Sequence, residues 1–225
     1  MKQKLSYFAL LMGALLLQAC GGGGGLAGNA KDSTDPLIPL PVVDDGSDRP
    51  RPSDSALVIK SDGWQLKDVQ GKVVYLRGAN IEFGAKPFDR FKNITAIRDV
   101  RSNVVRLQLS KTTKKEELEG ALVEISDKGM VALLTLVDST LTCKDDTDAL
   151  DGAVNKLWLD TWLSVIAQDR FQPHLMINYA HQWGPKSVFT ENTVGYGDYI
   201  EAHKLAIRQF RKAGLRVPLV IDASG

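Results

Sequence analysis

The sequence predicts an α/β fold in which helices cover a parallel sheet. Helical and strand patterns alternate with short loops between them, which is typical of parallel strands joined by helices. The strand segments are apolar runs rather than alternating patterns, which indicates burial on both faces of the sheet. Helices are expected at 87–101, 114–128, 151–169 and 195–213, and strands at 103–109, 130–137, 174–180 and 217–222.

A short hairpin is expected before this regular region, over residues 57–67, with its turn at 61–63. Residues 73–76 then read as a buried strand, which brings the expected parallel strands to five. Gly129 and Gly214 follow two of the helices and are natural C-caps. The alternation fits either a doubly wound sheet or a barrel. No glycine-rich phosphate loop follows a strand, which disfavours a nucleotide-binding site.

The charge balance excludes an electrostatic attraction to nucleic acid. The chain has 225 residues, with 28 basic and 27 acidic ones and a net charge of +1. Its 2 cysteines and 3 histidines match no familiar metal-binding spacing, so we expect neither a metal nor a cofactor. His174 and His203 are expected to be ordinary surface groups.

The N-terminus has the pattern of an export signal. Lys2 and Lys4 precede an apolar stretch over 7–17. This stretch is shorter than the roughly twenty residues that cross a bilayer, and we interpret residues 1–19 as a signal peptide. The sequence LQAC at 17–20 resembles the lipobox of bacterial lipoproteins, which implies that Cys20 carries the lipid. The alternative is an ordinary signal peptide that ends near a chance cysteine.

Residues 20–55 are predicted to be a tether that holds the folded part away from the membrane. Glycines come first, at 21–25, and a stretch rich in proline, aspartate and serine follows. An edge strand at 37–43 is the alternative, which the prolines disfavour. Gly21 follows Cys20, and by the same resemblance this implies an exported protein anchored in the outer membrane. The folded domain is expected at 56–225.

Four segments of that domain resemble glycoside hydrolase family 5, which contains cellulases and mannanases. They are GKVVYLRGAN at 71–80, NVVRL at 103–107, INYAHQWGP at 177–185 and VIDASG at 220–225. In this order they are similar to the first, second, fourth and fifth strands of that family. The resemblance implies a partial (β/α)8 barrel, with five of the strands, and a β-linked polysaccharide as the partner. A complete barrel of this type takes about 250 residues.

The resemblance also implies which residues occupy the catalytic positions. Retaining glycosidases hold two carboxyl groups about 5.5 Å apart, one as nucleophile and one as acid/base. The family places the acid/base glutamate after an asparagine at the end of strand four, where this sequence has His181 and Gln182. An amide cannot transfer the proton. Arg106 is retained, but the strand that carries the nucleophile lies beyond the five matched ones. We therefore expect this chain alone to be inactive on glycosidic bonds.

Other candidate residues keep two interpretations each. Arg106 either points into the barrel mouth or forms a structural ion pair. Trp183 either stacks on a sugar or packs in the core. Asp138 and Asp222, at the ends of strands three and five, either bind sugar hydroxyls or cap local structure. His181 is a new catalytic base or a neutral replacement. Asn80 is a further substrate-binding candidate at the end of the first strand.

Three functions follow from these observations. The first is an inactive relative of an extracellular β-glycanase that binds polysaccharide. The second is an active hydrolase whose reading frame continues beyond codon 225, with a later glutamate strand. The third is a structural lipoprotein without a sugar role, or a fragment without a stable fold. Open sheet edges would also allow two copies to associate.

Overall fold

A computed structural model describes residues 60–63, 65–68, 71–84, 90–184 and 194–223. The predicted signal peptide, Cys20 and the tether lie outside the described residues and stay predictions. Within the described part, the chain has no helix of the length and hydropathy that a membrane span requires.

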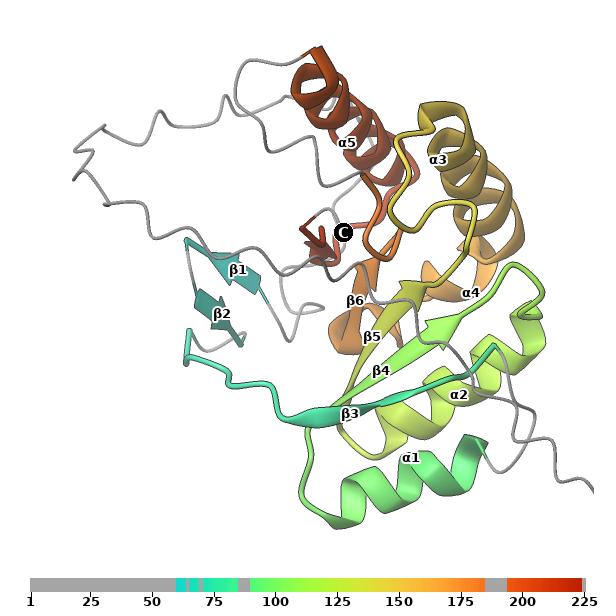
Figure 1. Cartoon of the computed structure of the whole chain (residues 1–225). Coiled ribbons are helices and arrows are strands. Elements are labelled where there is room, and N and C mark those ends of the chain that lie inside the picture. Colours follow the sequence, from blue (N-terminus) through green and yellow to red (C-terminus); the bar gives the residue numbers. More distant parts are fainter. Residues whose placement is uncertain (1–59, 64, 69–70, 85–89, 185–193, 224–225) are drawn as a thin grey trace, which may run out of the picture. The chain divides into compact units, whose positions relative to one another are not determined.

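The centre of the fold is a five-stranded sheet in which every neighbouring pair is parallel (Figure 1). The strands follow one another in the sheet as they do in the sequence. They are β3 (Gly78–Ile81), β4 (Val104–Leu109), β5 (Val131–Leu136), β6 (Leu175–Asn178) and β7 (Leu219–Val220). The predicted α/β fold with five parallel strands is therefore confirmed.

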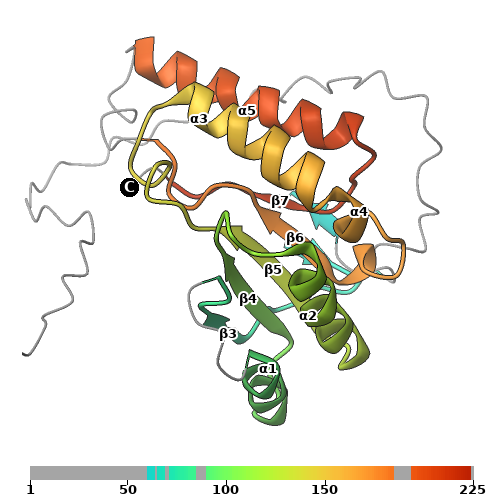
Figure 2. The same cartoon turned by 90° about the vertical axis from the view of Figure 1, so that its right-hand side faces the viewer.

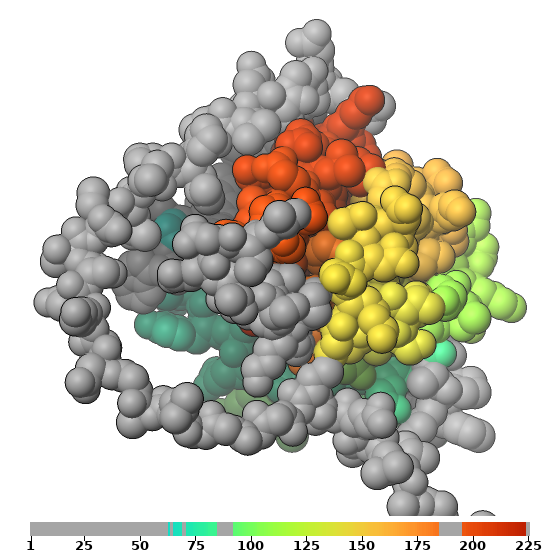
Figure 3. All heavy atoms as spheres, turned by 45° about the horizontal axis from the view of Figure 1, so that its top comes forward, coloured from blue at the N-terminus to red at the C-terminus, as the bar shows by residue number. Residues whose placement is uncertain are grey.

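Helices cover one face of this sheet, which we call the outer face (Figure 2). They are α1 (Arg90–Asp99), α2 (Lys115–Asp127), α3 (Thr147–Ala153), α4 (Leu163–Ile166) and α5 (Val194–Lys212). Strand β4 buries Val105, Leu107 and Leu109 against them. α3 and α5 lie side by side (Figure 3), and the Nε2 of Gln209 donates to the Oδ1 of Asp151 over 2.7 Å.

The other face, which we call the inner face, is less evenly covered: the expected burial on both faces holds along most of β5 and all of β6, but not along β3 and β4. Buried and half-buried residues alternate along β4. β1 (Lys60–Asp62) and β2 (Gln65–Lys67) form the predicted antiparallel hairpin, but its turn comes after Asp62 and not at 61–63, because Ser61 and Asp62 pair with Leu66 and Gln65. Leu66 of β2, together with Val74 and Leu76, packs against Val131 and Met176 of the inner face. Apolar residues therefore cover its amino end.

The predicted strand at 73–76 is wrong, and the first parallel strand is β3 instead. Val74 donates its N–H to the carbonyl of Leu66 over 2.8 Å, so this segment follows the hairpin rather than the sheet. Tyr75 is 77% exposed. The parallel strand begins at Gly78, where a Cβ would lie 1.8 Å from the carbonyl oxygen of Val104. Only glycine fits this close approach.

The predicted helix at 151–169 is also partly wrong. It begins earlier, because the side chain of Asp146 accepts the N–H of Ala149 and caps α3. α3 continues into the π-helical segment η2 (Val154–Thr161) and then into the short α4.

Two fully buried tryptophans, Trp158 and Trp162, donate their indole N–H to the carbonyls of Tyr179 and Thr113.

The remaining expected elements agree with the structure to within a few residues. The strand predicted at 217–222 is shorter, since only β7 pairs with β6. Gly129 has φ +63° after α2 and ends that helix as predicted.

Candidate functional site

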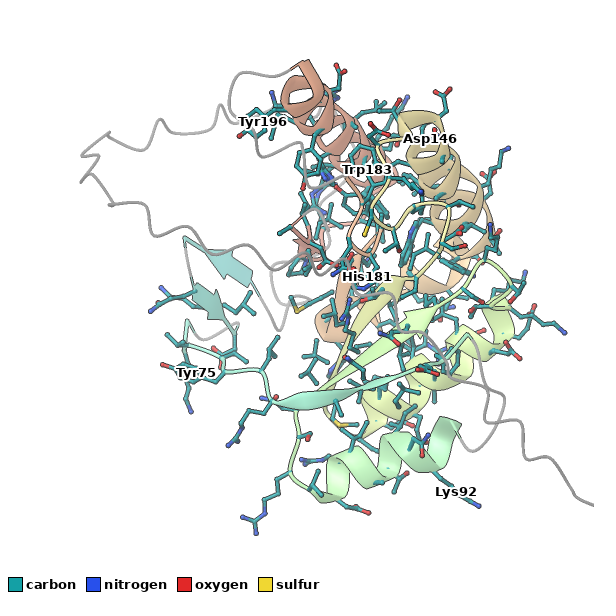
Figure 4. The ribbon with its side chains drawn as sticks, in the orientation of Figure 1. Tyr75, Lys92, Asp146, His181, Trp183 and Tyr196 are labelled. Atoms are coloured by element: carbon teal, nitrogen blue, oxygen red, sulfur yellow. The ribbon has the colours of Figure 1, made fainter. Side chains whose placement is uncertain are left out.

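Polar side chains gather where the parallel strands end. Parallel strands bring their carboxyl ends to one edge of a sheet, and active sites of α/β barrels lie at this edge. Arg106 lies on the inner face of β4, His181 follows β6 and Asp222 follows β7. We call these three residues the strand-end cluster. Figure 4 shows His181 at the ends of the strands, between the sheet and α5.

The carboxylate of Asp222 holds the cluster together. Its Oδ1 accepts the amide N–H of Asn178 over 2.7 Å, and its Oδ2 accepts the backbone N–H of Gln182 over 3.1 Å. The same Oδ2 lies 2.8 Å from the Nδ1 of His181 and 3.9 Å from the Nη2 of Arg106. Asp222 therefore connects β4, β6 and β7 and has both oxygens occupied.

The tautomer of His181 follows from these distances. Its Nδ1 lies 2.8 Å from the Asp222 carboxylate and 3.1 Å from the Nη2 of Arg106. A carboxylate only accepts hydrogen bonds and a guanidinium only donates them. If Nδ1 carried no proton, its lone pair would face the carboxylate oxygen at the shorter of the two distances. The Nδ1 proton therefore goes to Asp222, and in the neutral ring Nε2 is the acceptor.

Arg106 is oriented from its other side by β5. Its Nε donates to the hydroxyl of Thr135 over 2.9 Å, and Thr135 is fully buried. About a quarter of the side chain is exposed, at 23%, and the same holds for His181. Both interpretations of Arg106 thus apply in part, because it faces the inner side of the sheet and also approaches a carboxylate.

Gln182 stands in a strained backbone position next to the cluster. Its φ is +50°, in the left-handed region that residues other than glycine rarely adopt. Its N–H donates to Asp222, and its carbonyl accepts the N–H of Cys143 over 2.8 Å. The hydroxyl of Thr142 also donates to the carbonyl of His181. The segments after β5 and β7 thus hold the His181–Gln182 segment from two sides.

Asp138 is paired with a cation outside the strand-end cluster. Its Oδ2 lies 3.1 Å from the Nζ of Lys111, and its Oδ1 accepts the N–H of Thr140. Burial alone would raise the pKa of this carboxyl, but the hydrogen bonds from Thr140 and Lys111 outweigh burial and lower it. Asp138 is therefore ionised at neutral pH and stabilises the turn that follows β5.

Trp183 is a packed residue here. It is 2% exposed, its ring stacks on Tyr199 at 5.6 Å between centroids, and its indole donates to the carbonyl of Asp146. Figure 4 shows it between Asp146 and α5. The side chains of Tyr179 and His203 complete this group, which we call the aromatic cluster. Its packing favours the core interpretation of Trp183 over sugar stacking.

The expectation that His203 is a surface group is wrong. It is 6% exposed, and its Nδ1 pairs with the hydroxyl of Tyr179. Burial lowers the pKa of His203 to about 4 and raises that of Tyr179, so both are neutral at pH 7. The other histidine, His174, is half-buried with its Nδ1 next to the carbonyl of Met130.

Some residues of this region were not among the sequence candidates. Thr135 and Asn178 are polar residues within apolar strands, the same signal that singled out Arg106. Tyr199, on α5, donates its hydroxyl to the carbonyl of Asp222, and nothing in the sequence indicates this contact. Asn80 is exposed within β3, in register with Arg106 of β4. Within the described part of the chain, no three His, Cys, Asp or Glu side chains gather as a metal site.

Comparison with known proteins gives structural similarity without sequence similarity. Neither a family model nor a curated protein matches the chain. The solved catalytic domain of a mannanase from Streptomyces sp. SirexAA-E matches with a TM-score of 0.60 and 20% identity, over 76% of this chain and 52% of that domain. An endo-1,4-β-mannanase from Eisenia fetida matches with a TM-score of 0.49 and 10% identity, over 73% of this chain and 61% of that enzyme.

The fold is similar to part of a mannanase catalytic domain. This rests on the Streptomyces structure, and at 20% identity the similarity shows the fold alone. The chain spans about half the length of that domain. The five parallel strands and their helices thus share the fold of part of that barrel, and the partial barrel that the sequence implies is confirmed as a fold.

Proposed function

We propose that this chain is an exported, glycoside hydrolase-like lipoprotein that binds a β-linked polysaccharide without cleaving it. The mannanase-like fold supports the polysaccharide as partner, and the position at the strand ends supports the place of binding. The expected absence of cleavage rests on one observation. Gln182, an amide, occupies the position that the family resemblance assigns to the acid/base, and it cannot donate a proton to a departing sugar oxygen.

The described carboxylates beside it do not replace the missing acid. Asp222 has both oxygens engaged by Asn178, His181 and the backbone of Gln182. Asp138 is paired with Lys111 and is held ionised. An ionised carboxylate has no proton to give, and one that accepts several hydrogen bonds is a poor nucleophile. The strand ends offer donors and acceptors for sugar hydroxyls instead.

Binding and cleavage are tested on the purified full chain. Affinity electrophoresis in gels with β-mannan, glucomannan or β-glucan should retard the protein, and reducing-sugar assays should stay at background. Asn80→Ala should weaken binding about 2- to 10-fold, the effect of one hydrogen bond. Asn93→Ala, the same change on the exposed surface of α1, is the matched control. Unretarded migration in all three gels would contradict the proposed function.

Gln182→Glu tests the catalytic part of the proposal. We expect no reducing-sugar release from this variant, because restoring the acid still leaves no free carboxylate nucleophile among the described neighbours. Turnover by the wild-type chain that Asp138→Ala or Asp222→Ala abolishes would contradict the proposal directly.

The location is part of the same proposal. Cys20 would carry the lipid and residues 20–55 would form the tether, and with Gly21 after Cys20 the domain would lie at the outer membrane. Labelled palmitate should enter the wild-type protein in bacteria and not Cys20→Ser. Equal labelling of both would reject the lipid attachment site.

Association of two copies through the edges of β3 and β7 would appear as a dimer in light scattering.

A further inference from the structure

The strand-end cluster holds a histidine in the arrangement of a general base. Asp222 fixes the Nδ1 proton of His181 at 2.8 Å, which leaves Nε2 with its lone pair. Among the described residues, Nε2 has no hydrogen-bond partner, and 23% of the side chain is exposed. A carboxylate that orients an imidazole in this way is the pairing that hydrolases use to raise the effectiveness of a histidine base.

Arg106 adds a donor beside this base. Its Nε is engaged by Thr135 and its Nη2 lies against His181 and Asp222. Among the described residues its Nη1 has no partner, so it keeps two N–H donors for a ligand oxygen. A base and a cationic donor side by side are the two groups that hydrolysis of a carbonyl compound needs.

We propose that His181, oriented by Asp222 and assisted by Arg106, hydrolyses acyl esters carried on the hydroxyl groups of a polysaccharide. The carbohydrate part of this substrate rests on the proposed function, and the ester rests on the geometry. Glycosidic cleavage needs a proton donor for the leaving oxygen in the first step and a carboxylate at the anomeric carbon. Ester hydrolysis needs neither group. The imidazole takes a proton from water in the first step and gives it to the leaving sugar oxygen in the second.

The steps balance without a further reactant besides water. Nε2 of His181 takes a proton from water while the water oxygen bonds to the ester carbonyl carbon. The carbonyl π electrons move to the oxygen, where Arg106 stabilises the negative charge. Collapse of this intermediate breaks the bond between the acyl carbon and the sugar oxygen. The imidazolium Nε2–H returns its proton to that oxygen, which leaves a carboxylic acid and a free sugar hydroxyl.

Asp222 is a positioning residue in this scheme, because it acts through the imidazole. Its carboxylate keeps Nδ1 protonated and stabilises the imidazolium that forms after the first proton transfer. Asp222→Asn keeps the size of the side chain and loses the charge. It should lower kcat for ester hydrolysis on the order of 100-fold or more while KM stays within about 2-fold, since the ligand-facing groups remain. A purely structural role would alter both constants.

The test measures acetate release by the full chain from O-acetylated glucomannan, with p-nitrophenyl acetate as a second probe. His181→Gln should lower the rate at least about 100-fold, the smaller end of the effect of a general base. His174→Gln is the matched control, because His174 precedes β6 at the opposite end of the strand. It should keep the wild-type rate. Circular dichroism of each variant establishes that it is folded.

Two results would overturn the inference. One is no acetate release above buffer by the folded wild-type chain. The other is release that His181→Gln leaves unchanged. Affinity electrophoresis separates these from failure of the proposed function: a chain that binds glucomannan and releases no acetate refutes only the esterase activity. A chain that cleaves p-nitrophenyl acetate but binds no polysaccharide refutes the carbohydrate part alone.

Discussion

His181 and His203 lie on neighbouring elements and have opposite surroundings. His181 belongs to the strand-end cluster, where it is partly exposed and faces both a carboxylate and a guanidinium. His203 belongs to the aromatic cluster, where it is 6% exposed and faces the rings of Tyr179, Trp183 and Tyr199. The first environment supports a proton transfer and the second keeps the ring neutral. The same residue type thus lies among charged groups in one cluster and among aromatic rings in the other.

The two clusters are also connected. Tyr199 stacks on Trp183 and donates its hydroxyl to the backbone carbonyl of Asp222. Burial raises the pKa of Tyr199, and the charge of Asp222 raises it further, so this hydroxyl stays a donor. The aromatic cluster therefore supports the strand-end cluster from the side of α5, and damage to the first should reach the second.

Trp183→Ala should produce the largest loss of stability. Truncating a buried tryptophan to alanine costs about 3–5 kcal/mol, because it leaves a cavity and here also removes the stack on Tyr199. Urea denaturation measures the free energy of unfolding. A loss below about 1 kcal/mol would show that the ring is not packed as described, and would revive the sugar-stacking interpretation of Trp183.

The buried state of His203 predicts a loss of stability in acid. The unfolded chain takes up a proton at this imidazole below about pH 6.5, whereas the folded one resists until its pKa of about 4. The free energy of unfolding should therefore fall by up to about 3 kcal/mol between pH 6.5 and pH 4. His203→Gln lacks this titration, so its unfolding free energy should fall less over that range. If the unfolding free energies of the two proteins fell in parallel with pH, His203 would be solvent-exposed in the folded chain.

Gln182→Gly should have the smallest effect. Glycine adopts φ +50° without strain, which gains up to about 1 kcal/mol, while its greater freedom in the unfolded chain opposes part of that gain. The thermal midpoint should stay equal or rise by a few degrees. A clear fall in the thermal midpoint would show that the side chain of Gln182 makes a stabilising contact.

Periodicity predicted the regular part of the fold well. The strands at 103–109 and 130–137 and the helices at 114–128 and 195–213 agree with β4, β5, α2 and α5 to within about two residues. Their boundaries depend on local signals such as Gly129. The strand at 73–76 failed because Val74 bonds to Leu66 and not to β4, a choice between two partners that apolar character does not distinguish.

Local sequence patterns identified some residues of the candidate site and missed others. Arg106 and Asp222 interrupt or end apolar strands, and such positions are visible in a sequence. Their contact with each other through His181 joins positions that are far apart in the chain, and no local pattern contains it. Tyr199 and His203 sit on one face of an ordinary amphipathic helix, so their sequence context does not distinguish packing from exposure.

The sequence by itself determined the alternation of helices and strands, the apolar strands and the amide at position 182, because these depend on neighbours along the chain. Only the tertiary structure decided which strand ends meet, which histidine is buried and which nitrogen of His181 holds the proton. Those properties depend on desolvation and on charges brought together from β4, β6 and β7, and free energies of this kind arise only when the chain has folded.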